Sequence, residues 1–221
     1  LTVALETVYD TAKDRLVFDV GHQSYVHKLL TGRRENFTTL RQFGGMSGFP
    51  KPEESITDAF VAGHASSAVS IALGMARART LQQKSYQVVA LMGDGAATGG
   101  MAYEGLNDAA DSREPIVIVL NDNEMSISRN VGGMSKYLSS VRTKEGYAEL
   151  KLRVERTLSA IPVIGRPLAY GLYQLKNGIK QFLVPGMLFE DMGITYLGPV
   201  DGHDVKTMIR VLKEAKRVQH A

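Results

Sequence analysis

The stretch that decides the fold is residues 86–99, which read Tyr-Gln-Val-Val-Ala-Leu-Met-Gly-Asp-Gly-Ala-Ala-Thr-Gly. An apolar run over 86–92 is followed by Gly93-Asp94-Gly95 and then by a helical pattern over 100–110. A buried strand that ends in a glycine loop and opens onto a helix is typical of a parallel α/β sheet, in which ligands bind at the carboxyl ends of the strands. The sequence therefore predicts a binding edge at Asp94.

The next strand of this unit ends in a second polar cluster. Residues 115–120 are apolar and run into Asn121-Asp122-Asn123, and 25 residues separate Gly95 from Asn121. That is the length of one right-handed crossover, which would place the two strands side by side and both clusters at one edge. Glycines and a helix N-terminus suit a diphosphate, but an aspartate would repel it unless a divalent cation lay between them. We expect a Mg²⁺ site made by Asp94, the amide oxygen of Asn123, a backbone carbonyl near Met125 and diphosphate oxygens.

The rest of the chain alternates helical and strand patterns, which predicts an α/β domain with a mainly parallel sheet. Residues 37–63 are rich in glycine, proline and acidic residues and are expected to form a long loop. Residues 137–182 have a helical pattern that Pro162 and Pro167 interrupt. The other expected elements are helices 1–9, 66–81, 186–192 and 204–218 and strands 15–20 and 193–198.

Composition excludes several classes of protein. The 221 residues are 44% hydrophobic and contain no cysteine, which rules out a disulfide scaffold, an iron–sulfur centre, a thiolate zinc site and a cysteine nucleophile. No apolar run is long enough to cross a membrane, so we expect no membrane insertion. The lack of cysteine fits a reducing cytoplasm.

The positive charge is concentrated in one segment. The net charge is +3, but residues 126–182 hold ten Lys or Arg and three Glu, so +7 lies there and −4 elsewhere. The segment has no nucleic-acid-binding motif. We therefore favour solvated helix faces, or a mobile lid near an anionic ligand, over a nucleic-acid or membrane surface.

Several motifs together resemble one enzyme family. The Gly-Asp-Gly and Asn-Asp-Asn pair is similar to the diphosphate-binding signature of thiamine-diphosphate enzymes. The flanking sequences resemble 1-deoxy-D-xylulose-5-phosphate synthase rather than transketolase or a pyruvate dehydrogenase subunit, and they extend over the whole chain: Asp19-Val-Gly-His-Gln23, His27-Lys28, Thr31-Gly-Arg-Arg34, Asn121-Asp-Asn-Glu-Met-Ser-Ile-Ser128 and Gly198-Pro-Val-Asp-Gly-His-Asp204.

The resemblance implies a fold, a reaction and partners. The fold would be a three-layer thiamine-diphosphate-binding fold with a mainly parallel sheet flanked by helices. Residues 1–221 would form its N-terminal diphosphate-binding domain, with 126–182 a basic helical insertion. The reaction would join pyruvate to D-glyceraldehyde 3-phosphate with loss of CO₂, giving 1-deoxy-D-xylulose 5-phosphate for isoprenoid, thiamine and pyridoxal biosynthesis. The cofactors would be thiamine diphosphate and Mg²⁺, in a cytoplasmic homodimer that binds neither nucleic acid nor membranes.

The resemblance also implies site residues. His22 would be catalytic and would contact the cofactor, Gly63-His64-Ala65 would line its cleft, and Gly95 and Ala96 would contact the diphosphate through their backbone. Asp94, Asn123 and the Met125 carbonyl would ligate Mg²⁺. Ala65 departs from the family, which usually has serine there, so a backbone contact rather than a hydroxyl contact is expected at that position. The remaining histidines, His27, His203 and His220, are expected to be structural or on the surface.

Two alternatives stay open from sequence alone. One is another transketolase-like enzyme, such as a split transketolase subunit. The other is a binding module, either a non-catalytic relic that keeps the cofactor site or a basic surface-binding protein that uses 126–182. The chain starts inside a helical pattern at Leu1 without a methionine, so we also expect a piece of a longer enzyme. The glutamate-bearing and C-terminal domains of the family have no counterpart in it, and alone it would bind cofactor weakly and not turn over.

Overall fold

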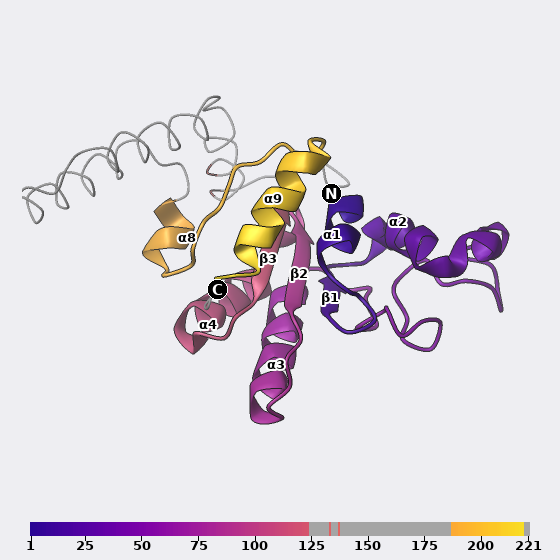
Figure 1. Ribbon diagram of the computed structural model, residues 1–221, viewed down its shortest axis with the longest axis horizontal. Helices are drawn as coiled ribbons and strands as arrows, with labels where there is room; N and C mark the ends of the chain where they lie inside the picture. Colours follow the sequence, from indigo (N-terminus) through magenta and orange to yellow (C-terminus); the bar gives the residue numbers. More distant parts are fainter. Residues whose placement is uncertain (124–132, 134–136, 138–186, 219–221) are drawn as a thin grey trace, which may run out of the picture.

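The computed structural model describes residues 1–123, 133, 137 and 187–218. Their centre is a parallel sheet of β1 (Arg15–Phe18), β2 (Val88–Gly93) and β3 (Val117–Asn121), in the order β1-β2-β3 (Figure 1). β1 pairs with β2 from Arg15↔Val88 to Phe18↔Leu91, and β2 pairs with β3 from Val89↔Val117 to Gly93↔Asn121. The expected parallel sheet is confirmed.

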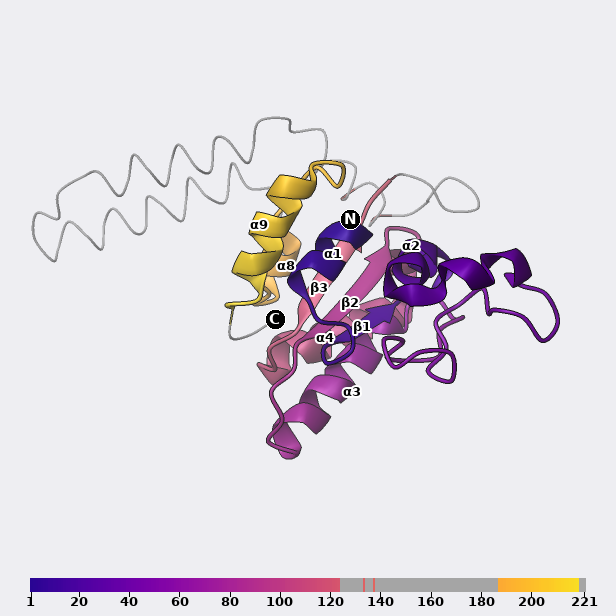
Figure 2. The same cartoon turned by 45° about the vertical axis from the view of Figure 1, so that its right-hand side comes forward.

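Helices cover both faces of this sheet, because alternate strand residues point to opposite sides. One face packs against α3 (Ala68–Leu81) and α4 (Gly100–Ser112), and the other packs against α1 (Thr2–Val8) and α9 (Val205–Ala215) (Figure 2). The first face carries Val17, Val88, Ala90 and Met92, and the second carries Leu16, Phe18, Val89 and Leu91. The three-layer α/β fold is thus confirmed.

Small residues let α3 and α4 approach each other closely. Five buried positions on the two helices are alanines: Ala68, Ala72, Ala76, Ala102 and Ala109. A Cβ atom added to Gly105 of α4 would lie 2.8 Å from the Ser70 Oγ of α3. This close packing holds the start of α4 beside the start of α3, which matters for the site described below.

The segment after β1 projects from the side of the sheet. It contains short helical turns, η1 (His22–Ser24), α2 (Tyr25–Lys28), η2 (Leu29–Arg33) and η3 (Arg34–Thr39), which the sequence analysis did not assign (Figure 1). The expected long loop follows from residue 40, and it lasts until α3 begins.

One expected strand is wrong. Residues 194–200 follow α8 (Met187–Asp191) without pairing to any strand in the part of the chain that the structure describes. Their apolar side chains pack instead, since Ile194 is buried in the core and the ring of Tyr196 stacks on Phe189 with centroids 6.1 Å apart. Side-chain burial rather than a sheet ladder explains the apolar pattern of 193–198.

Several expectations concern residues outside the part of the chain that the structure describes. The basic segment 126–182, apart from Gly133 and Tyr137, lies outside the described residues, as do Met125 and His220. Within the described residues, none of the helices has the length and apolar character that a membrane span needs.

Candidate functional site

The ends of β2 and β3 bring two aspartates together. Gly93 pairs with Asn121, and the Asp94 backbone N–H donates to the Asn121 carbonyl at 3.1 Å. The next residues along the two strands, Asp94 and Asp122, are therefore neighbours. Asp94 is only 3% exposed. Burial, followed by the adjacent Asp122 carboxyl, raises the pKa of Asp94, and backbone N–H groups at Asp94 and Gly95 offset this only in part.

This pair has the chemistry of a cation site. A buried carboxyl beside a second carboxyl holds its proton more tightly than a free one, because two negative charges at close range repel each other. A divalent cation would remove that repulsion and favour the ionised form of both groups. The residues that follow β2 and β3 offer carboxylates and the amide of Asn123, and such hard oxygen ligands suit Mg²⁺.

The loop after Asp94 exposes backbone near the start of a helix. It forms the single turn η4 (Ala96–Thr98), and α4 then begins at Gly100 without a side-chain cap. Gly99 has to be glycine, since a Cβ atom there would collide with the Ser66 side chain. Uncapped N–H groups at the start of a helix favour negatively charged ligands.

His22 lies on a tight turn after β1. Val20 and Gly21 have φ of 59° and 99°, and a Cβ atom at Gly21 would lie 2.6 Å from Pro50 Cδ and 2.9 Å from Ala62 Cβ. The turn therefore requires glycine and close contact with the long loop. His22 follows directly and is exposed at the start of η1.

Three hydrogen bonds join the segments that carry the predicted site residues. The Val20 N–H donates to the His64 carbonyl at 3.2 Å, and the Ser66 Oγ donates to the Ala96 carbonyl at 2.8 Å. The bond from Asp94 to Asn121 completes the chain. Gly63, His64 and Ala65 are exposed, whereas Ser66 is buried. Apart from Met125, the structure thus gathers the loops of all predicted site residues at one edge of the sheet.

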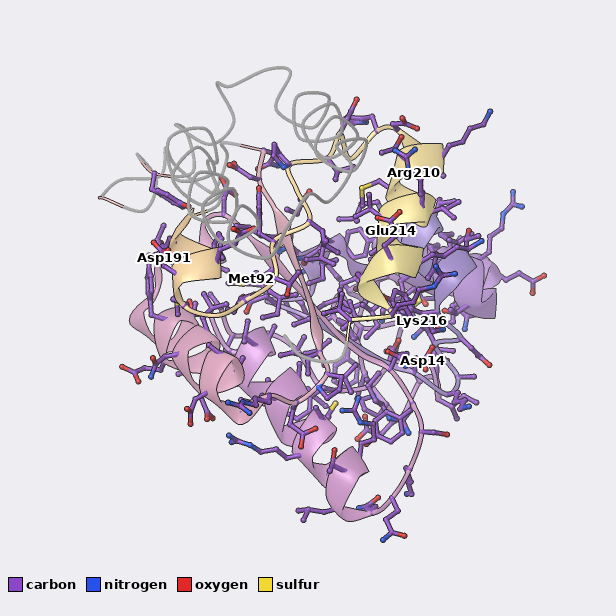
Figure 3. The ribbon with its side chains drawn as sticks, turned by 60° about the vertical axis from the view of Figure 1, so that its left-hand side comes forward. Asp14, Met92, Asp191, Arg210, Glu214 and Lys216 are labelled. Carbon is purple, nitrogen blue, oxygen red and sulfur yellow. The ribbon has the colours of Figure 1, made fainter. Side chains whose placement is uncertain are left out.

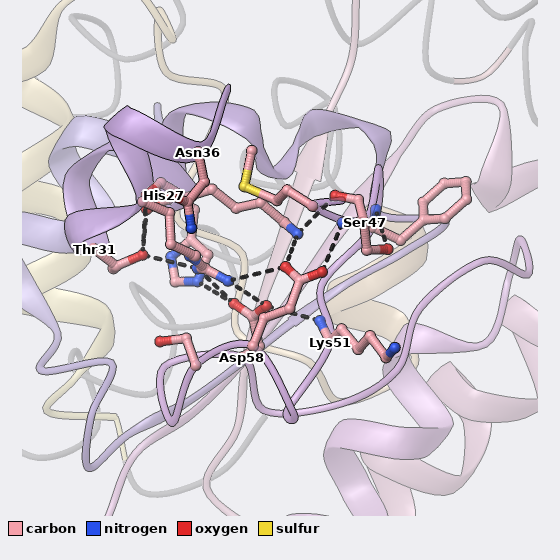
Figure 4. Close-up of polar contacts among 12 residues, drawn as sticks. His27, Thr31, Asn36, Ser47, Lys51 and Asp58 are labelled. Carbon is pink, nitrogen blue, oxygen red and sulfur yellow. Dashed lines mark hydrogen bonds and ion pairs between the residues drawn. The ribbon is translucent and has the colours of Figure 1, made fainter. Parts of the chain in front are cut away.

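A buried charge network fixes the long loop and was not foreseen from the sequence (Figure 4). Asp58 accepts two bonds from the Arg33 guanidinium, at 2.6 and 2.8 Å, and one from the Lys51 backbone N–H at 2.7 Å. Lys28 donates from Nζ to Glu54 at 2.7 Å and to the Ser47 carbonyl at 2.8 Å. These bonds attach residues 47–58 to the helical turns after β1.

His27 lies at the centre of this network. Its Nδ1 is 2.6 Å from a Glu6 oxygen and its Nε2 is 3.0 Å from an Asp58 oxygen. Both nitrogens can donate only in the imidazolium form. Burial lowers the pKa of His27, but the hydrogen bonds and charges of Asp58 and Glu6 outweigh burial and raise it. Burial would likewise raise the pKa of Asp58, and the bonds from His27, Arg33 and Lys51 hold it well below its usual range. His27 is therefore structural, one of the roles expected for it.

The fold is similar to that of a transketolase. A solved structure of transketolase from Campylobacter jejuni subsp. jejuni covers 99% of this chain and 31% of its own chain, with a TM-score of 0.64 and 19% sequence identity. That likeness concerns the fold alone.

The sequence defines the family. The family profile described as 1-deoxy-D-xylulose-5-phosphate synthase matches residues 1–221, and the chain belongs to that family. Relatives named 1-deoxy-D-xylulose-5-phosphate synthase from Clostridium kluyveri and Lachnoclostridium phytofermentans are 54% identical over 220 residues and 53% identical over 221 residues. Each match covers 100% of this chain and 35% of the relative, so the chain spans a minor part of the curated relatives.

The first prediction concerns the imidazolium in the buried network. His27→Gln removes a charge from between two carboxylates and is expected to lower the free energy of unfolding by about 3 kcal/mol near pH 6. A raised pKa means that the fold holds the proton more tightly than the unfolded chain, so this stabilisation is complete below the ordinary value of 6.5 and declines as pH rises through the folded-state pKa.

Denaturant titrations of the wild type and His27→Gln at several pH values would measure this difference. It should shrink as the pH rises. The exposed His203 gives a matched control, and His203→Gln is expected to unfold like the wild type at every pH. A difference between the wild type and His27→Gln that stays constant from about pH 6 to about pH 10 would show that His27 carries no charge in the fold.

Proposed function

We propose that the protein uses thiamine diphosphate and Mg²⁺ to condense pyruvate with D-glyceraldehyde 3-phosphate, giving 1-deoxy-D-xylulose 5-phosphate and CO₂. The observation that carries this proposal is the pair of neighbouring carboxyls at the ends of β2 and β3, where burial and Asp122 raise the pKa of Asp94. Family membership supplies the reaction, and the pair supplies a reason for a cation at this edge. Residues 1–221 would form the diphosphate-binding domain of the enzyme.

The residues present fit a magnesium diphosphate. The Asp94 carboxylate and Asn123 amide oxygen would ligate Mg²⁺, with the Met125 carbonyl as a third protein ligand. The backbone of Gly95 and Ala96 would contact the diphosphate near the start of α4, where N–H groups lack a side-chain cap. Together these contacts would hold the diphosphate partly through Mg²⁺, which is how Mg²⁺ commonly binds phosphates.

The cofactor, when bound, supplies the electron sink that decarboxylation of pyruvate needs. This chain's part is position and proton transfer. The exposed His22, on its fixed turn, would donate a proton to a substrate oxygen or accept a proton from it. Gly63, His64 and Ala65 would line the cleft beside it. Because Ala65 has no hydroxyl, any polar contact there would come from the backbone.

Further proposals rest on the family alone. They are a homodimer in the cytoplasm that binds neither nucleic acid nor membranes, and a role in isoprenoid, thiamine and pyridoxal biosynthesis. We also propose that residues 1–221 by themselves bind cofactor weakly and do not turn over.

The metal site gives a direct prediction. In the protein expressed from its complete reading frame, Asp94→Asn should weaken Mg²⁺-dependent binding of thiamine diphosphate by at least about 100-fold, because a direct ligand should matter more than an outer-shell partner. Isothermal calorimetry measures the affinity. The matched control is Asp108→Asn, which removes an exposed carboxylate of α4 that pairs with Arg77 at 2.6 Å and should leave the affinity unchanged.

The same site sets the sign of a pH effect. Because the pKa of Asp94 is raised, a proton competes with Mg²⁺ for this carboxylate. Magnesium affinity of the wild type should therefore rise with pH through that pKa and then level off. Equal affinities for the wild type and Asp94→Asn would contradict the assignment.

His22 gives a second prediction. At saturating cofactor, His22→Gln should lower kcat by about 100-fold or more, the usual contribution of a proton-transfer group. The exposed side chain contributes little to packing, so the thermal midpoint should stay near that of the wild type. An unchanged kcat would remove His22 from the reaction.

The reaction itself separates the proposal from its alternative. With carboxyl-labelled pyruvate and D-glyceraldehyde 3-phosphate, the protein from the complete reading frame should release labelled CO₂ and form 1-deoxy-D-xylulose 5-phosphate, detected by mass spectrometry. Turnover of a ketose phosphate donor without release of CO₂ would favour a transketolase instead. No turnover of either pair, with cofactor still bound, would favour a non-catalytic module.

A further inference from the structure

Asp19 is a buried carboxylate that contacts several of the segments described above. It follows β1 directly and is 1% exposed. One carboxylate oxygen accepts the Ser66 N–H at 2.8 Å and the other accepts the Ala68 N–H at 3.0 Å, at the start of α3. Its backbone N–H donates to the Leu91 carbonyl of β2 at 2.7 Å.

The backbone of Asp19 also fixes the turn that carries His22. Its carbonyl accepts the Gly21 N–H at 2.6 Å and the Gln23 Nε2 at 3.0 Å, so it is bonded to residues on both sides of His22. The same turn donates from the Val20 N–H to the His64 carbonyl. Asp19 therefore holds the His22 turn through its backbone and the segment after His64 through its side chain.

Ser66 extends this connection to the diphosphate loop. Its N–H is held by Asp19, and its Oγ donates to the Ala96 carbonyl at 2.8 Å. Ser66 has a φ of 69°, a conformation that a residue other than glycine keeps only when its surroundings impose it. Here the imposed conformation directs the backbone N–H to Asp19 and the hydroxyl to Ala96.

We infer that Asp19 is a positioning residue, which sets the relative places of His22, His64 and Ala96 through Ser66 and thereby the affinity for thiamine diphosphate. The inference rests on the proposed function, because it assumes that these three segments meet the cofactor. The geometry requires a carboxylate: each oxygen accepts one backbone N–H, and an asparagine would turn an NH₂ donor toward one of those N–H donors.

Asp14 offers a matched comparison at the opposite end of β1. It is also buried, at 5% exposed, and also accepts two backbone N–H groups, from Gln87 at 2.8 Å and Asp10 at 3.1 Å. Figure 3 shows it beside Lys216 at the end of α9, where the carboxylate and the ammonium are 3.9 Å apart. Because it precedes β1, it lies at the amino edge of the parallel sheet, away from the candidate site.

The test compares Asp19→Asn with Asp14→Asn in the protein from the complete reading frame. Both variants should lower the thermal midpoint, because each loses a buried acceptor. Calorimetry at saturating Mg²⁺ should then show thiamine diphosphate affinity reduced about tenfold or more in Asp19→Asn and unchanged in Asp14→Asn, in line with the effect of residues that orient ligands.

Ser66→Gly keeps the inference testable if Asp19→Asn does not fold. Glycine adopts a positive φ readily, so the fold should persist while the bond to Ala96 is lost. The expected loss of cofactor affinity is about three- to tenfold, the usual effect of one hydrogen bond.

The outcomes separate the two claims. If the wild type binds thiamine diphosphate and Asp19→Asn binds as tightly as Asp14→Asn, or if Ser66→Gly keeps the wild-type affinity, the positioning role is wrong and the proposed function stands. If the wild type does not bind thiamine diphosphate at all, the proposed function is wrong and the positioning role is wrong with it.

Discussion

The main constraint in this structure is that two carboxyls, those of Asp94 and Asp122, lie at the same edge of the sheet. The register of β2 and β3 makes Asp94 and Asp122 neighbours, and Asp94 is almost fully buried. Repulsion between two ionised carboxyls opposes stability, and it is strongest where water is excluded. The pair is reasonable when a cation completes it. Perturbed carboxyls of this kind commonly mark functional sites, and here the perturbation lies at the sheet edge where α/β proteins bind ligands.

The rest of the fold holds other loops against that edge. Small residues bring α3 and α4 together, so the start of α3 lies against the loop before α4. The Asp19 carboxylate, just after β1, accepts N–H groups at the start of α3, and the buried network around His27 anchors the long loop before α3. These contacts are polar and largely buried, so they contribute more to fixing the positions of the loops than to net stability. Together they would hold exposed residues, His22 and His64 among them, in fixed places.

Much of this arrangement could be predicted from the sequence, and the reasons are local. The apolar run before Gly93 and the crossover length to Asn121 determine a parallel pair, and they predict that Asp94 and Asn123 share an edge. The spacing alone did not identify Asp122 as the neighbour of Asp94. Once Gly93 is known to pair with Asn121, the next residues on the two strands are Asp94 and Asp122. Several strand and helix ends differ from the expected ones by a few residues, as at β2, which begins at Val88 rather than at residue 86.

Other features could not be predicted because they depend on contacts between distant residues. The partners of His27, Glu6 and Asp58, lie 21 and 31 residues away in sequence, so no local pattern identifies the histidine as charged and buried. Asp19 and Ser66 were likewise missed as a pair, since they lie 47 positions apart in the sequence. The apolar residues of 193–198 match a strand pattern, yet they form no strand: Ile194 is buried in the core and Tyr196 stacks on Phe189.

The central claim is that a divalent cation lies between the Asp94 carboxylate and the diphosphate of the cofactor. Mn²⁺ replaces Mg²⁺ at oxygen sites and scatters anomalously, so a crystal of the protein from the complete reading frame grown with Mn²⁺ and thiamine diphosphate tests it directly. The account predicts an anomalous peak within metal-ligand distance, about 2.0 to 2.3 Å, of oxygen atoms of Asp94 and Asn123. Cofactor density at this edge with the metal peak elsewhere, or with no metal, would contradict it.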